Sequence, residues 1–116
     1  MRQQLIQTDR VYSIQRTAQG VACTVNGQSL PLRLDLWNHS PTGFEFGYGG
    51  SGPAQLALAI LADCCGDELA VTYHQAFKWA VIARIPGPGG SLTETFVRDV
   101  LAGLQAKRDS QQYRNN

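Results

Sequence analysis

The amino-acid sequence predicts an α+β fold: a small, mostly antiparallel β-sheet from the N-terminal half, packed against two to three C-terminal helices. Residues 11–36 carry β-branched residues and an alternation of apolar and polar residues, a pattern typical of strands. Residues 54–104 carry apolar residues at helical spacing, interrupted by glycine and proline. Because the strands precede the helices and do not alternate with them, the order favours α+β over a doubly wound α/β fold.

Length and composition indicate one small domain. The 116 residues suffice for a single domain (1–116), whose core we expect over 10–106, with a polar tail over 107–116. A hydrophobic fraction of 43% supports a packed core, and a net charge of +1 argues against a general nucleic-acid coat protein. No apolar run approaches the roughly 20 residues of a membrane span, and residues 1–10 lack the apolar segment of a signal peptide. We therefore expect a cytoplasmic protein that makes no membrane contact.

The strands are expected to form a hairpin. The run 21–25 is followed by Asn26-Gly27, a strong signal for a type I′ turn, because both central residues of that turn need φ above zero. Beyond the turn, a period of two predicts a strand with four leucines on one face: Leu30, Leu32, Leu34 and Leu36. A further short strand is expected over 44–46, where apolar and polar residues alternate again.

A central helix is predicted over 54–65, where nearly every residue is apolar. Gly52 or Ser51 would cap its start, Pro53 suits the first helical position, and Gly66 would end it. A helix that is apolar all round is buried on most sides, so this helix should be the most buried element, packed on the leucine face of the sheet.

Two further helices are expected after the central one. Asp67 and Glu68 place negative charge in the first turn of the second helix, where the helix dipole favours it. The proline- and glycine-rich residues 86–90 predict a connector, and Ser91-Leu92-Thr93-Glu94 predicts a capping box at the start of the third helix. The polar residues 107–116 are expected to fray.

Three cysteines, Cys23, Cys64 and Cys65, are present. A disulfide between adjacent cysteines would be strained, and no C-x-x-C pair exists that could combine with His74 in a zinc site. We therefore expect reduced, structural thiols, and neither a metal ion nor another cofactor.

A glycine-rich segment joins the last expected strand to the central helix. Gly47, Gly49 and Gly52 match G-x-G-x-x-G, but a dinucleotide site also needs a following parallel strand that ends in an acidic residue, and a helix follows instead. A P-loop is excluded by the missing lysine and Ser/Thr pair, and Pro53 stands where a nucleophile elbow at Ser51 needs glycine. Two interpretations stay open: free N–H groups of the turn bind a phosphate or carboxylate, or the glycines only permit a tight turn.

Polar residues in and near this segment are the candidate binding residues, and none of them qualifies as catalytic. His39 and Glu45 could form an acid–base pair, although Asn, His and Ser before a proline are also ordinary turn residues. Lys78, followed by Trp79, could be a surface anchor at a binding hot spot, although Trp79 could equally lie in the core. The candidates are Asn38, His39, Ser40, Glu45, Tyr48, Gly49, Gly50, Ser51 and Lys78.

One long motif resembles a known family. The run NHSPTGFEFGYGGSGPAQLA over 38–57, with Phe77-Lys78-Trp79 and Leu92-Thr93-Glu94, is similar to domain-of-unknown-function family 6166, an uncharacterised family of bacteria and their mobile elements. Phe46 stands where the family pattern leads us to expect a tryptophan, and Cys64-Cys65 replaces a more usual polar helix end. The resemblance implies no activity and no catalytic residues. It implies a setting of small accessory proteins on plasmids, prophages and integrated elements, which often bind host proteins, including defence systems.

Two functions from different classes follow. The first is a small, non-enzymatic interaction protein of a mobile element, such as an inhibitor of a host defence complex of the CRISPR or restriction type, whose partner is a host protein or a second copy of the chain. The second is a phosphate- or nucleotide-binding domain, with or without hydrolytic activity, built from the 47–52 turn and the 38–40 loop. We favour the first. An open pocket shared by His39, Glu45, Tyr48 and the turn amides would favour the second, and burial of these side chains within the fold would favour the first.

Overall fold

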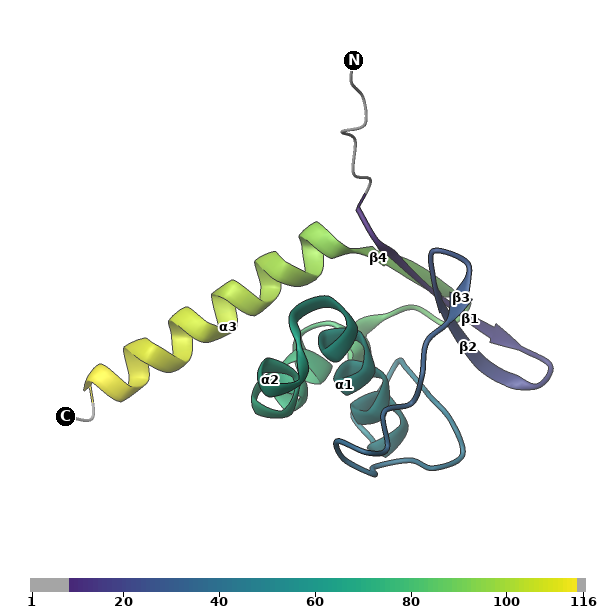
Figure 1. Ribbon diagram of the computed structural model, residues 1–116, viewed down its shortest axis with the longest axis horizontal. Helices are drawn as coiled ribbons and strands as arrows, with labels where there is room; N and C mark the ends of the chain where they lie inside the picture. Colours follow the sequence, from purple (N-terminus) through teal and green to yellow (C-terminus); the bar gives the residue numbers. More distant parts are fainter. Residues whose placement is uncertain (1–8, 115–116) are drawn as a thin grey trace, which may run out of the picture.

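A computed structural model describes residues 9–114, and it contains one four-stranded sheet. The strands are β1 (Val11–Thr17), β2 (Gly20–Val25), β3 (Gln28–Ser29) and β4 (Gly89–Thr93), in the order β3-β2-β1-β4. Every neighbouring pair is antiparallel (Figure 1). Three of the strands come from the N-terminal part and the helices follow, so the α+β fold is confirmed.

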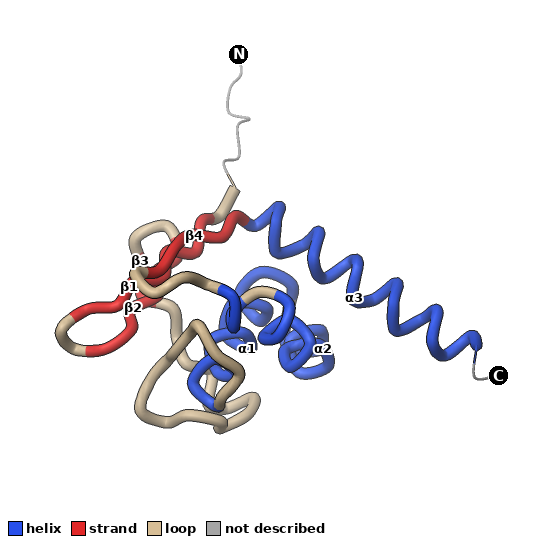
Figure 2. Tube along the Cα trace, turned by 180° about the vertical axis from the view of Figure 1, so that it is seen from behind, coloured by secondary structure: helices blue, strands red, loops and turns tan. Residues whose placement is uncertain are grey.

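The helices are α1 (Ser51–Cys65), α2 (Asp67–Ala80), the short 3-10 helix η2 (Ile82–Arg84) and α3 (Glu94–Arg114). The first two pack against one another beside the sheet, whereas α3 leaves the end of β4 and extends away from the rest of the molecule (Figure 2). Its last turns cover the polar stretch where the composition predicts fraying. Gly66, with φ of 100°, separates the first two helices as predicted.

The buried face of the sheet belongs to β1 and β2. Tyr12 lies opposite Val25, and Ile14 lies opposite Cys23, all four being at most 6% exposed. Because residues two apart on a strand share a face, these two pairs form one apolar layer. This layer belongs to the same buried cluster as the apolar side chains of α1.

The predicted leucine strand is wrong. The hairpin turn at Asn26-Gly27 is confirmed, with φ of 49° and 85°, but the strand after it ends at Ser29. Pro31 has no N–H to donate to a ladder, and Arg33 adopts a left-handed φ of 60°, which an extended strand does not accommodate. The four leucines consequently do not share a face: Leu30 is buried, Leu32 and Leu36 are partly buried, and Leu34 is 36% exposed.

Two other local predictions also fail. The expected strand over 44–46 is reduced to a single bridge between Phe44 and Val21. The stretch expected to be a connector and a capping box forms β4 instead, because the free edge of β1 offers it a full ladder of partners. The cap of α3 is therefore Thr93 and not Ser91: the Thr93 hydroxyl accepts the amide of Phe96 at 3.1 Å.

The prediction that the central helix is the most buried element is confirmed. All of its residues from Gly52 to Ala62 are buried. Its cap is Gly50 and not Gly52 or Ser51, which places Pro53 at the third helical position. That position is still within the first turn, where an N–H has no partner inside the helix, so proline is tolerated there.

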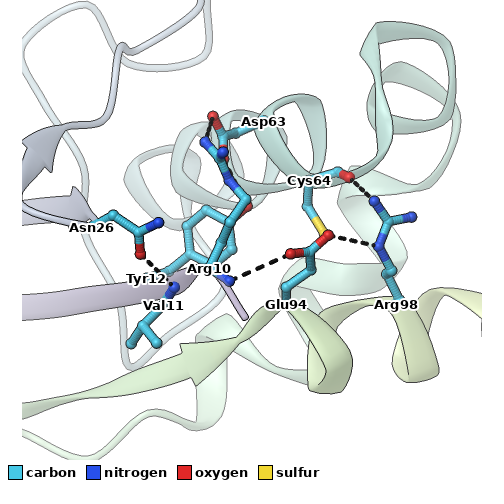
Figure 3. A network of polar contacts seen from close by, with 8 residues as sticks. All are labelled: Arg10, Val11, Tyr12, Asn26, Asp63, Cys64, Glu94 and Arg98. Atoms are coloured by element: carbon cyan, nitrogen blue, oxygen red, sulfur yellow. Dashed lines mark hydrogen bonds and ion pairs between the residues drawn. The ribbon is translucent and has the colours of Figure 1, made fainter. Parts of the chain in front are cut away.

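A polar network ties the start of β1 to the end of α1 (Figure 3). The Arg10 guanidinium donates to both carboxylate oxygens of Asp63, at 3.0 and 2.9 Å, and the Tyr12 hydroxyl donates to the same carboxylate at 2.7 Å. Burial, and next the Asp63 carboxylate, raise the pKa of the Tyr12 hydroxyl. The buried phenol is therefore a hydrogen-bond donor at neutral pH.

The same network holds the first turns of α3. The Arg98 guanidinium donates to the Glu94 carboxylate at 3.0 Å and to the backbone carbonyl of Cys64 at 2.7 Å, near the end of α1 (Figure 3). Glu94 also exchanges hydrogen bonds with the backbone of Arg10. A cation on the last carbonyls of a helix is favoured by the helix dipole, so Arg98 links the two helices with a charge-assisted bond.

The cysteine thiols are free. Burial raises the pKa of the Cys23 thiol to about 12 and that of Cys64 to about 12, so both thiols are protonated at neutral pH. Among residues 9–114, no cluster of three His, Cys, Asp or Glu side chains could hold a metal ion. None of the helices in this range combines the length and the hydrophobicity that a membrane span requires. The signal-peptide inference concerns residues 1–10, and residues 1–8 lie outside the described part of the chain.

Candidate functional site

The connection from β3 to α1 is held in place by one buried amide. The Gln55 side chain is fully buried, and its Nε2 donates to the carbonyls of Leu32 and Trp37, at 2.6 and 3.0 Å. Its Oε1 accepts the amides of His39 and Ser40, at 2.8 and 2.9 Å. All four hydrogen bonds that a primary amide can make are therefore formed with the connection's backbone. The side chain replaces the strand partner that this backbone lacks.

Two histidines from distant parts of the chain contact each other next to the backbone that Gln55 holds. His39 and His74 approach at 2.9 Å between their Nε2 atoms, and His74 Nδ1 lies 2.9 Å from the carbonyl of Ala70 and 3.0 Å from that of Val71. Because Nδ1 of His74 faces only acceptors, it carries the proton. His74 Nε2 then accepts the hydrogen bond that His39 Nε2–H donates.

Trp37 completes a cluster of three rings. Its ring stacks on His39, with centroids 5.1 Å apart and planes at 11°, and it is tilted against His74 at 5.2 Å. Burial is the main cause that lowers the pKa of His39, and the neighbouring His74 and Lys78 lower it further. His39 is therefore neutral at pH 7.

Lys78 and Trp79 connect α2 to the glycine turn. Lys78 is only 7% exposed, its Nζ donates to the carbonyl of Gly49 at 3.1 Å, and it lies 4.5 Å from the centre of the Trp79 ring. The Trp79 ring covers Gly49 so closely that a Cβ there would lie 2.0 Å from it. Trp79 is nevertheless 59% exposed, so it belongs to the surface and not to the core.

Gly47 has φ of 90°, a left-handed backbone that favours glycine, whereas Gly50 and Gly52 serve close packing. A Cβ at Gly50 would lie 2.5 Å from the Tyr48 ring, and a Cβ at Gly52 would lie 2.6 Å from the Glu45 side chain. Neither has a positive φ, so the turn needs these glycines for their small size and not for left-handed backbone. This observation supports the structural interpretation of the glycine motif.

The structure separates several of the candidate residues. Glu45 pairs with Arg16 at 2.9 Å, while His39 bonds to His74, so the considered acid–base pair of His39 and Glu45 is not formed. The Ser40 hydroxyl donates to the carbonyl of Gly43 at 2.6 Å, as in an ordinary turn. The side chains of Asn38 and Ser51 are exposed.

Three large aromatic rings are about half-exposed on or against this segment: Trp37, Tyr48 and, from α2, Trp79. We call these three rings the aromatic surface. These rings are 47%, 52% and 59% exposed. Each ring rests with one side on the fold: Trp37 on His39, Tyr48 on Gly50, and Trp79 on Gly49. The rings are therefore held in place while their other sides face solvent.

Sequence reasoning missed three residues of this site: Trp37, Gln55 and His74. A signal existed for Gln55, because it is the single amide in an otherwise apolar helix segment and a buried amide needs partners. For Trp37 and His74 there was no local signal, because their contact depends on the packing of the connection against α2.

Comparison with protein-family models tests the resemblance that the sequence motif suggests. The model described as "Family of unknown function (DUF6166)" matches residues 12–106. The chain belongs to this family. Comparison with curated proteins and with solved structures gives no match.

The region matched to DUF6166 runs from β1 into α3 and includes the whole site. The resemblance on the 38–57 motif is thereby confirmed for the family. Membership in DUF6166 identifies no activity, so the function of this DUF6166 protein is argued from its own geometry.

Proposed function

We propose that this DUF6166 protein is a non-enzymatic interaction protein that binds a partner protein through its aromatic surface. The observation that carries the proposal is the pre-set position of three half-exposed rings, Trp37, Tyr48 and Trp79. Trp and Tyr supply most of the binding free energy in many protein interfaces. Rings that are already held in place lose little conformational entropy on binding, so more of the contact energy appears as affinity.

The class of partner is suggested by the family resemblance, which implies an accessory protein of a mobile element. Small accessory proteins of mobile elements often bind host proteins, so a host defence complex of the CRISPR or restriction type, met in the cytoplasm, is the first partner class that we propose to test. A second copy of the chain is the other partner class, and it would make the protein a homodimer. Binding either partner class requires no catalysed reaction. This agrees with a site in which His39 and Glu45 are hydrogen-bonded or ion-paired to other side chains.

Phosphate or nucleotide binding is the second candidate, and one observation favours it. Lys78 is a buried cation beside the start of α1, where helix N–H groups attract anions. Against it, the Gly49 and Gly50 backbone is covered by Trp79 and Tyr48, which leaves little access for a phosphate. Thermal melting in millimolar phosphate or nucleotide tests this candidate. We expect no shift. A saturable shift that is lost in Ser51→Ala and His39→Ala would replace the interaction proposal.

The interaction proposal is tested with the double variant Trp37→Ala, Tyr48→Ala. Affinity purification from the host lysate should recover a defined partner with the wild-type protein and lose it with the double variant. Phe96→Ala is the matched control, because Phe96 is 43% exposed but lies outside the aromatic surface. The recovered partner is then purified and titrated against all three proteins. Equal affinity for the wild type and the double variant, with unchanged melting temperatures, would contradict the proposal.

A further inference from the structure

A groove of about 680 Å³ lies between α2 and α3. Helix α2 lines it with residues 72, 73, 76, 79 and 80, and α3 lines it with residues 104, 107, 108 and 111. Both sets follow helical spacing of three and four, so each helix turns one continuous face toward the groove. The groove opens because α3 diverges from the body along its length (Figure 1). Two diverging helix faces leave room for a third helix between them.

The floor of the groove is apolar. Its apolar lining includes the Tyr73 ring and the partly buried Leu104, together with the small side chains of Ala76 and Ala80. Alanines leave depth into which larger apolar side chains of another helix can insert. Trp79 is also a lining residue, so the groove adjoins the aromatic surface.

The charges around the groove have one sign. Within residues 9–112, the arginines on the rest of the surface, Arg10, Arg16, Arg33 and Arg98, each pair with a carboxylate. Three further cations line the groove and make no ion pair with a described carboxylate: Arg84, Lys107 and Arg108. No acidic side chain is among the described groove residues. The groove thus carries positive charge in a protein whose net charge is only +1.

We infer that this groove binds an acidic amphipathic helix of the partner protein. The apolar side of that helix would rest on the Tyr73 and Leu104 floor, and its carboxylates would face Arg84, Lys107 and Arg108. Charge complementarity of this kind selects the partner and steers its approach. A nucleic acid fits the groove less well, because phosphates gain nothing from a floor of alanine and leucine side chains. The inference rests on the proposed function, since Trp79 belongs to both surfaces.

The test uses a fluorescein-labelled helical peptide of about 18 residues, with leucines at positions i, i+3, i+4 and i+7 and glutamates on the opposite side. A second peptide carries lysine in place of every glutamate. Fluorescence anisotropy should show saturable binding of the acidic peptide, at least about tenfold tighter than that of the basic one. Binding should weaken as the salt concentration rises, because exposed charges are screened. Equal binding of the two peptides, or no binding of the acidic one, would overturn the inference.

Two sets of variants locate the binding. Arg84→Gln with Arg108→Gln removes two positive charges from the groove, and Ala76→Trp fills it without changing the charge. Each should weaken binding by about tenfold or more. The control Ala18→Glu with Gln19→Glu adds two negative charges in the exposed turn between β1 and β2, so the net charge changes equally, and affinity should stay within about twofold. Equal loss in the control would show that only net charge matters, and would overturn the inference.

Other occupants of the groove give different results. Tighter binding of a single-stranded oligonucleotide than of the acidic peptide, abolished by the arginine variants, would assign the groove to nucleic acid. Dimerisation in light scattering that is lost in Ala76→Trp would assign it to a second copy of the chain. Either result overturns the inference.

Failure of the inference is distinguishable from failure of the proposed function. If Trp37→Ala with Tyr48→Ala abolishes partner recovery while the groove variants do not, the interaction proposal stands and this inference fails. If the acidic peptide binds the groove but the aromatic variants retain every partner, the aromatic surface is wrongly assigned. Circular dichroism and melting of each variant show whether it is folded.

Discussion

The helices α1 and α3 differ in almost every property except their secondary structure. The first has 15 residues, is apolar nearly all round and is buried along most of its length. The second has 21 residues, yet its buried residues within the described side chains are Val97 and Leu101, both in its first half. Helical stability in proteins comes mainly from tertiary packing. The shorter helix therefore holds the fold together, and the longer one supplies surface.

The number of contacts to the rest of the fold also varies along α3 itself. The first turns of α3 are tied to the body by hydrogen bonds of Glu94 and Arg98. In its later turns, the Arg108 guanidinium lies 5.6 Å from the centre of the Tyr73 ring of α2. Local stability follows the number of buried contacts, so it should fall from the start of α3 toward its end. This gradient places the proposed groove on the more adaptable part of the molecule.

The largest effects should come from the core of α1. Leu58 and Ile60 are fully buried and lie on different faces of the helix, so Leu58→Ala and Ile60→Ala should each lower the free energy of unfolding by about 2–5 kcal/mol. Urea denaturation measures the loss. Near-wild-type stability of both variants would mean that α1 is peripheral and would reverse the comparison.

The next largest effect should come from the amide anchor. Gln55→Leu keeps the volume but leaves the carbonyl of Leu32 and the amides of His39 and Ser40 without their partner, which should cost about 2–4 kcal/mol. Gln75→Leu on the exposed side of α2 is the matched control and should change stability by less than about 0.5 kcal/mol. The two variants are compared by urea denaturation. Similar losses in both would show that the connection is not held by Gln55.

A smaller loss is expected at the glycine turn. Gly49→Ala places a methyl group against the Trp79 ring, which must swing away from Lys78, at a cost of about 1 kcal/mol. Tryptophan fluorescence should report the displaced ring, and melting should report the lost stability. Gly87→Ala, where a Cβ meets open space, should leave the fluorescence unchanged. An unchanged spectrum for Gly49→Ala would contradict the packing of Trp79 on this turn.

The opposite sign is expected in α3. Gly103 is exposed within the helix and has open space around it, so Gly103→Ala should raise the free energy of unfolding by about 0.5–1 kcal/mol through higher helix propensity. Circular dichroism follows the helix content and the melting temperature together. A gain in helix content without a gain in melting temperature would show that the later turns of α3 unfold separately from the body.

The smallest effect should be a dependence on pH. Burial, with His74 and Lys78, lowers the pKa of His39, so the unfolded chain binds more protons than the folded one between the lowered pKa and about 6.5. The free energy of unfolding should therefore be highest above pH 6.5 and fall as the pH drops toward the lowered pKa. Urea midpoints over this range should show the slope, and His39→Gln should reduce it. A midpoint that rises on acidification would contradict the lowered pKa of His39.

Several features of this fold follow from the sequence by itself. Asn26-Gly27 sets the hairpin turn, Gly66 separates two helices, and the apolar run over 54–65 specifies a buried helix. These features depend on φ preference and side-chain polarity within a few neighbouring residues. They can therefore be predicted without knowing which distant residues they contact. The long motif over 38–57 likewise identified the family.

Tertiary structure decided the rest. The stretch over 89–93 becomes a strand because β1 has a free edge. The leucine alternation after Ser29 is already weakened as a strand by Pro31, and in the fold Gln55 takes up the carbonyls of Leu32 and Trp37 instead. His39 meets His74 only after the connection has packed on α2. Each of these outcomes is a competition between backbone partners that lie far apart in sequence. The hydrogen bonds that form depend on which groups the folded chain brings within hydrogen-bond distance, and tertiary packing decides this.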